Sequence, residues 1–267
     1  MIAEILNGAL VYSLVGIAAG FLSGLFGIGG GIIVVPALLY IFKDNQFIPV
    51  LQLMRFAVGT SLAIMLFTSF VSIRSHQKLG EVLWSVYQRL WFWISIGVIA
   101  GSVATNFMPT YWIKTIFAVF LLFISWKMLT GMGRAGPNHF PSRSMNSLVN
   151  FVIGLLSGLL GVGGGTLIIP YLTYCGVDSH RITAVTVLCS LTIALLGTFI
   201  FMILGSYEHY QSSMTLGYIY WPAALWVAIP SMIFAPMGAR LTYVLPVKQL
   251  RYAFVVLLLI TAVNLLT

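Results

Sequence analysis

Two glycine-rich stretches of the chain could bind a small anion through bare backbone N–H groups. Residues 20–31 read GFLSGLFGIGGG, and residues 154–165 read GLLSGLLGVGGG. Over the 21 positions that end at Tyr40 and at Tyr174, 12 residues are identical in the two copies. Glycine lets the backbone turn and lets a ligand approach its N–H groups closely. Two such breaks in corresponding places of two halves point to a binding site between internal repeats.

The last glycines of each stretch are expected to begin a second half-helix. A helix N-terminus presents free N–H groups and the positive end of the helix dipole, which suit an anion. If the two halves are inverted, both N-termini point at one place near the middle of the membrane. The alternative is that the glycines only let helices pack closely, as small residues do in membranes. The candidate binding residues at these N-termini are Gly29, Gly30, Gly31, Gly163, Gly164, Gly165 and Thr166.

Two arginines and seven hydroxyl side chains are further candidates for the substrate site. Arg55 and Arg181 stand at equivalent places, at the entrance to the span that follows each glycine stretch. Each could bind an anion with two hydrogen bonds, or could lie at the membrane surface as an interfacial residue. The hydroxyl groups either line a path for the anion or satisfy backbone carbonyls. These residues are Ser23, Ser157, Thr60, Ser61, Thr166, Thr186 and Ser190.

The sequence argues against other kinds of site. No Gly-Lys-Ser or Gly-Lys-Thr follows the glycines, so they do not form a nucleotide-binding loop. All five carboxylates fall in loops or at segment ends, whereas cation sites and proton relays use acids within spans. No metal site and no cofactor are therefore predicted. An intramembrane serine hydrolase would need a histidine base near Ser23 or Ser157, but all four histidines are loop residues, so no enzyme is expected.

The composition places these stretches in a membrane. Of the 267 residues, 60% are hydrophobic and 7% are charged, against about 25% charged residues in soluble domains. The net charge of +8 comes from single Lys and Arg residues scattered between apolar runs, which does not indicate nucleic-acid binding. We expect an integral, multi-pass protein of the inner membrane. Its expected partners are the lipid bilayer and a small anionic substrate, and a homodimer is left open.

The apolar segments divide the chain into two similar halves. The first repeat, 1–131, is expected to contain a hairpin over 8–42 and helices over 56–74, 88–108 and 111–131. The second repeat, 147–267, is expected to contain a hairpin over 147–175 and helices over 182–205, 217–238 and 247–266. A linker rich in Gly and Pro joins them over 132–146. The predicted fold is an all-α polytopic membrane protein with two inverted repeats, each a glycine-broken helical hairpin plus three transmembrane helices.

The basic residues favour hairpins over simple spans. If each glycine stretch crossed the membrane once, six basic residues would lie on one side and seven on the other. If each stretch returns to its starting side, Lys43, Arg55 and Lys114 share one side and the other ten share the opposite side. Cytoplasmic loops carry the excess of Lys and Arg. The sequence thus predicts both termini outside the cell and the linker in the cytoplasm.

The duplicated motif resembles that of the sulfite exporter TauE/SafE family of membrane permeases. The motif runs from Ser23 to Pro36 and again from Ser157 to Pro170, each time preceded by a glycine three residues earlier. Residues 57–61 (AVGTS) after the first copy support the resemblance, which covers nearly the whole chain. The second copy departs from Gly-Thr-Ser and reads Thr-Val-Leu there, so a role of Thr60 and Ser61 does not transfer to that half. The resemblance implies transport of sulfur oxyanions or organosulfonates, mostly outward.

We therefore expect a secondary transporter that exports sulfite or an organosulfonate by alternating access between the repeats. The negative potential of a cell interior pushes each negative charge outward by about 2.3 kcal/mol per 100 mV, so an anion exporter needs no coupling ion. Two alternatives stay open. One is a non-transporting membrane scaffold, and the other is a permease or importer of another small anion such as a carboxylate.

Overall fold

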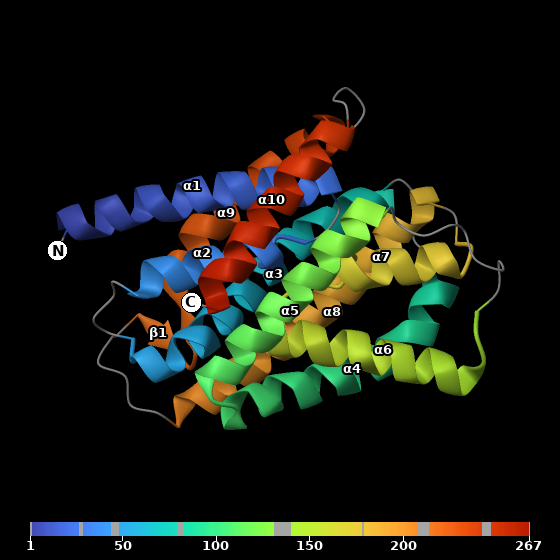
Figure 1. The fold of residues 1–267 in the computed structure, drawn as a ribbon, viewed down its shortest axis with the longest axis horizontal. Coiled ribbons are helices and arrows are strands. Elements are labelled where there is room, and N and C mark those ends of the chain that lie inside the picture. The colour runs from blue at the N-terminus through green and yellow to red at the C-terminus, as the bar shows by residue number, and fades with distance from the viewer. Residues whose placement is uncertain are drawn as a thin grey trace.

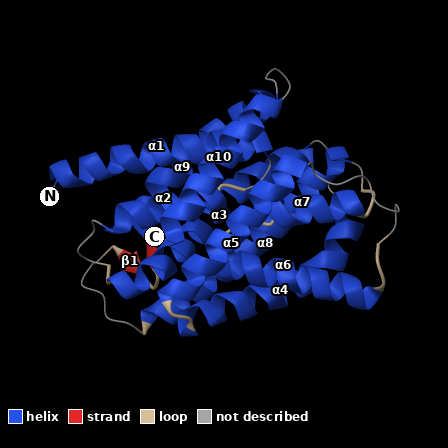
Figure 2. Cartoon of the chain, in the orientation of Figure 1, coloured by secondary structure: helices blue, strands red, loops and turns tan. Residues whose placement is uncertain are grey.

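The chain folds almost entirely into helices, as a computed structural model shows (Figure 2). The structure describes residues 2–26, 29–43, 48–78, 83–130, 140–177, 179–207, 214–241 and 247–266. Within these ranges, seven helices are long and apolar enough to cross a membrane. The chain is thus an integral, multi-pass membrane protein built mainly from helices.

The described residues of the first half form five α-helices. They are α1 (Ile2–Phe26), α2 (Gly31–Lys43), α3 (Leu53–Lys78), α4 (Trp84–Phe107) and α5 (Thr110–Thr130), with a short 3-10 helix over Val50–Gln52 before α3. Five more α-helices lie in the part of the second half that the structure describes. They are α6 (Arg143–Leu160), α7 (Gly165–Tyr174), α8 (Ser179–Ser206), α9 (Trp221–Leu241) and α10 (Val247–Leu266).

Several helix boundaries differ from those expected, and two of them change the layout of the chain. The helix expected from residue 217 begins at Trp221, because the residues before it form the strands β1 (Thr215–Leu216) and β2 (Ile219–Tyr220). Gly217 turns between the strands with a φ of 59°, a conformation that favours glycine. The linker expected over 132–146 ends earlier, because Arg143 already begins α6. Its part up to residue 139 lies outside the described residues.

Both glycine stretches break the chain between two antiparallel helices. In Figure 1, α1 enters from the left and α2 returns to the left, while α6 enters from the right and α7 returns to the right. Helix α1 packs along α9, and α4 packs along α6, so the first helix of each half lies against a later helix of the other half. Helices α3 and α8 pack against each other in the centre. An inverted repeat would make these pairings, and the inversion itself stays a prediction.

Glycines let the paired helices approach until their backbones touch. A Cβ built on Gly101 in α4 would lie 2.1 Å from the carbonyl oxygen of Leu155 in α6. A Cβ on Gly20 in α1 would lie 2.6 Å from the carbonyl oxygen of Ser231 in α9. Small residues in membrane helices allow such contact, and close van der Waals packing drives the association of these helices. Close packing therefore accounts for part of the glycine pattern.

Candidate functional site

The two glycine breaks lie against each other in the middle of the molecule. A Cβ built on Gly29 would be 3.2 Å from the Cα of Gly163, and one on Gly31 would be 2.3 Å from the carbonyl oxygen of Gly161. Gly29 and Gly161 have φ angles of 75° and 68°, which L side chains rarely adopt. Gly161 ends α6 in this conformation, and its N–H donates to the carbonyl of Ser157. The glycines are thus needed both for the turns and for the contact between them.

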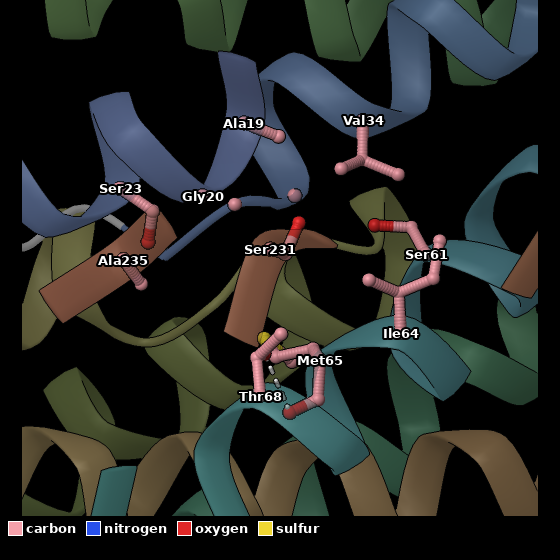
Figure 3. A pocket seen from close by; sticks show the side chains of 12 residues that line it. Ala19, Gly20, Ser23, Val34, Ser61, Ile64, Met65, Thr68, Ser231 and Ala235 are labelled. Carbon is pink, nitrogen blue, oxygen red and sulfur yellow. Dashed lines mark hydrogen bonds between the residues drawn. The ribbon is translucent and has the colours of Figure 1, made fainter. Parts of the chain in front are cut away.

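A cavity of about 330 Å³ opens beside the first break. It lies between the end of α1, the start of α2, and α3, α8 and α9. A smaller lobe of about 30 Å³ extends it toward α2, and Figure 3 shows side chains that line this lobe. The lobe and the larger part share Ser23, Gly30, Met65, Thr68 and Ala235. Such a volume lies near the lower end of the range for ligand pockets, about 300–1,000 Å³. The cavity is therefore large enough for a small molecule.

Hydroxyl groups supply most of the polar surface of this cavity, which we call the central cavity. None of the described residues that line it is ionisable. Apolar contacts come from residues such as Met65, Val71 and Met232. A ligand here would meet neutral hydrogen-bond donors and methyl or thioether groups. The hydroxyl residues are Ser23, Ser61, Thr68, Ser69, Ser72, Thr183, Thr186, Ser190 and Ser231.

Thr186 is the hydroxyl whose surroundings point most directly to a ligand. Its side chain is 3% exposed, and its Oγ1 atom has no hydrogen-bond partner among the described residues. Other hydroxyls on the lining are already bonded, since Ser61 donates to the carbonyl of Gly161 at 2.9 Å and Ser231 to that of Gly16 at 2.8 Å. A buried polar group without a partner costs free energy. A hydrogen-bonding ligand in the cavity would remove that cost.

The N-terminus of α2 supplies the second polar feature of the central cavity. Gly30 and Gly31 line it where α2 begins. A helix leaves its first N–H groups without intrahelical partners, and its dipole places partial positive charge there. A Cβ built on Gly30 would meet nothing closer than 3.8 Å, so this position is open to the cavity. The lining can therefore stabilise negative charge although none of its described residues is a cation.

The cavity opens at one end of the molecule and is closed at the other. Its exposed lining residues are Val71, Thr183 and Pro236, in the second half of α3, the first turns of α8 and the second half of α9. These parts of the three helices lie at the end from which α6 enters (Figure 1). A ligand would thus enter from that end in this conformation.

Arg55 forms part of the opposite, closed end. Its guanidinium donates to the carbonyl of Asn106 at 2.7 Å and to the hydroxyl of Tyr218 at 3.3 Å. Tyr218 is fully buried and donates to the side chain of Asn106 at 3.0 Å. A cation is stabilised at the C-terminal end of a helix such as α4. Arg55 therefore ties α3 to the end of α4 and does not line the central cavity.

Thr60 joins the same closed end. Its hydroxyl accepts a hydrogen bond from the backbone N–H of Tyr220 at 3.1 Å, which fixes the β1–β2 hairpin to α3. Burial raises the pKa of the Tyr220 phenol, which stays neutral at physiological pH. Thr60 thus has a structural contact in place of the path-lining position that the sequence left open.

The remaining predicted residues fall into two groups. Ser23, Gly29, Gly30, Gly31 and Ser61 line the central cavity, all from the first half of the chain. Their counterparts from the second half are buried and do not line it; these are Ser157, Gly163, Gly164, Gly165 and Thr166. Arg181 is exposed at the start of α8, outside the lining. The two glycine breaks contact each other, but of the two helix N-termini only that of α2 lines the cavity among the described residues, and their convergence on one anion stays a prediction.

On α8, the sequence indicated Thr186 and Ser190 only within a larger set of hydroxyl groups, and it did not indicate Thr183. Thr183, Thr186 and Ser190 all line the cavity, together with Met232 of α9. Their spacing of three and four residues places the three hydroxyls on one face of a helix. A polar stripe at helical spacing within an apolar span was the available signal.

Comparison with known proteins agrees with a membrane transporter. A probable membrane transporter protein of Haemophilus influenzae is 32% identical over 256 residues, which cover 96% of this chain and 97% of that protein. Another, from Methanocaldococcus jannaschii, is 31% identical over 258 residues, which cover 89% of this chain and 88% of that protein. No solved structure matches the chain. Residues 12–265 match the family described as sulfite exporter TauE/SafE, and with these relatives that match shows that the chain belongs to the TauE/SafE family.

Proposed function

We propose that this membrane transporter exports a small sulfur oxyanion, sulfite or an organosulfonate, through the central cavity. The observation that carries the proposal is the combination of an α2 N-terminus with a hydroxyl lining that contains the unpartnered Thr186. Charge-assisted hydrogen bonds from neutral donors are strong in a low-dielectric site. A site without a fixed cation also releases an anion more readily than an arginine pair would.

The apolar part of the lining favours an organosulfonate over bare sulfite. Met65, Val71 and Met232 lie on the same cavity as the hydroxyl groups. A volume of about 330 Å³ exceeds that of a four-atom anion, since one water molecule occupies about 30 Å³ of the liquid. A short carbon chain would fill this space and contact the methionines. A carboxylate of the same chain length is the alternative substrate, and a scaffold without substrate is the alternative function.

Flux into proteoliposomes tests the proposal. We expect uptake or release of sulfite and of a two-carbon sulfonate, with weaker flux of the matching carboxylate. Thr186→Val should weaken binding of the transported anion about tenfold or more, because a hydrogen bond to a charged group contributes about 1.5–3 kcal/mol. The measurement is the anion concentration that half-saturates flux, compared between the wild type and the variant.

Thr198→Val is the matched control for this experiment. Thr198 lies on the same helix, is 4% exposed, and also has an Oγ1 atom without a partner among the described residues, but it does not line the central cavity. Flux through this variant should match the wild type. If Thr186→Val and Thr198→Val changed flux equally, the central cavity would not be part of the substrate path. Absence of flux for every anion would favour the scaffold.

We further propose that the open end of the cavity faces the cytoplasm. Nine basic positions lie on the helix ends at that side of the molecule, which is the pattern expected of a cytoplasmic face. Thr183→Cys should then react with a membrane-impermeant maleimide in inside-out vesicles and stay unlabelled in right-side-out vesicles. The natural Cys175 and Cys189 are buried, which keeps the background low. If Thr183→Cys reacted only from the periplasmic side, the proposed orientation of the molecule in the membrane would be the reverse of the true one.

A further inference from the structure

A second cavity of about 610 Å³ lies between α2, α5 and α10, on the outer surface of the helix bundle. Among the described residues, none lines both this cavity and the central cavity. Two of its lining residues are largely open to the surroundings, since Tyr40 is 78% and Leu257 41% exposed. The cavity is therefore accessible from the side of the bundle that faces the hydrocarbon of a membrane.

The lining of this side cavity is divided between a polar end and an apolar interior. Lys43 at the end of α2 and Lys114 near the start of α5 both line it, together with Asn264 near the end of α10. Ile32 and Ile33, at the beginning of α2, lie at its other end. The 13 residues of α2 span about 20 Å, which is more than half of the ~30 Å hydrocarbon core of a bilayer. The cavity thus extends from one membrane surface toward the midplane.

The two lysines stand where basic residues are scarce. Only Lys43, Arg55 and Lys114 lie at the end of the molecule at which α2 finishes, among the basic residues in described helices. Arg55 is engaged with Asn106 and Tyr218, which leaves Lys43 and Lys114 as the other two, and both line one cavity. If the two lysines were placed by chance, there would be no reason for both to line the same cavity.

From this arrangement we infer that the side cavity binds an anionic glycerophospholipid of the membrane leaflet. The phosphate lies between the ammonium groups of Lys43 and Lys114, which act as point charges that hold phosphate. One acyl chain extends along α2 toward Ile32 and Ile33. A free anion would use the lysines but leave the apolar interior empty, and a zwitterionic lipid would fill the interior with less attraction to the lysines. The proposal is independent of the transported substrate, because the two cavities are separate.

Lipid-dependent melting of the purified protein in detergent tests the inference. Phosphatidylglycerol should raise the melting temperature more than phosphatidylcholine with the same chains, and glycerol phosphate alone should have no effect. In the Lys43→Gln/Lys114→Gln variant, the concentration of phosphatidylglycerol needed for half the shift should rise about tenfold or more. The Lys43→Arg/Lys114→Arg variant keeps both charges and should respond like the wild type.

Two controls separate lipid binding from other effects of the substitutions. Lys127→Gln removes one positive charge from the other end of α5, away from the side cavity, and should leave the lipid response unchanged. Ala37→Trp fills the cavity while both lysines remain, and should abolish the response. An unchanged response in the double Gln variant and in Ala37→Trp would overturn the inference. The inference would also be overturned if glycerol phosphate raised the melting temperature as much as phosphatidylglycerol does. A dimer of this chain without bound lipid, detected by native mass spectrometry, would overturn it as well.

Discussion

Replacing Gly101 by alanine is expected to lower the melting temperature of the purified protein by roughly 2–12 °C. The added methyl group would lie 2.1 Å from the carbonyl oxygen of Leu155 and 2.9 Å from its carbonyl carbon, so α4 and α6 would have to separate. Overpacking of this kind costs about 1–3 kcal/mol, and each kcal/mol lowers the melting temperature by roughly 2–4 °C in a domain of this size. The measurement is thermal unfolding in detergent, in which the loss of the monodisperse species with temperature is monitored.

Two further glycines calibrate that experiment. Gly238→Ala should lower the melting temperature by as much as Gly101→Ala, because its methyl group would lie 2.1 Å from the carbonyl oxygen of Phe21 across the α1–α9 contact. Gly8→Ala should be neutral or stabilising, because its methyl group would meet only Tyr12 at 3.7 Å and alanine is the better helix former. If Gly101→Ala melted like Gly8→Ala, the close approach of α4 and α6 would be wrong.

The sequence predicted the position of the glycine breaks better than their roles. The repeated motif predicted that the chain turns between paired helices at 20–31 and 154–165, because a run of glycines is poor material for a helix interior. The motif could not distinguish glycines that pack helices together from glycines that line a cavity, since both roles require a residue without a side chain. Gly154 touches α4 and Gly30 faces the central cavity, although both belong to the repeated motif. Only the neighbours in space distinguish them.

The contacts of Arg55 show a second limit of sequence reasoning. An arginine at the entrance of a span can bind a ligand, reach the membrane surface or cap a helix, and the choice depends on what lies opposite. Its partners, Asn106 and Tyr218, are 51 and 163 residues away in the chain. The β1–β2 hairpin that carries Tyr218 was also missed, because two strands of two residues are too short for an alternating pattern. The apolar pattern there is equally compatible with a helix.

Gly30→Ala is expected to reduce anion binding without reducing stability. Its methyl group would meet Val34 at 3.8 Å and Ala19 at 3.9 Å, ordinary van der Waals distances, so the fold accommodates it. The methyl group would instead occupy the open space in front of the α2 N-terminus and keep an anion away from the N–H groups there. We expect an unchanged melting temperature in the absence of ligand, and an anion affinity about tenfold or more weaker, since hydrogen bonds to charged groups contribute about 1.5–3 kcal/mol.

The neighbouring glycine gives the opposite pattern and so makes the test decisive. Gly31→Ala would place a methyl group 2.3 Å from the carbonyl oxygen of Gly161, which is backbone and cannot turn away, so the melting temperature itself should fall. Gly164→Ala would meet chiefly the terminal methyl of Ile168, which can rotate, and Gly164 lies outside the central cavity, so its effect on anion binding should be small. Ligand-induced stabilisation of all three variants by a two-carbon sulfonate measures the difference. Full stabilisation of Gly30→Ala would place the anion away from the α2 N-terminus, and equal loss in Gly30→Ala and Gly164→Ala would mean that both helix N-termini face the anion in the bound state.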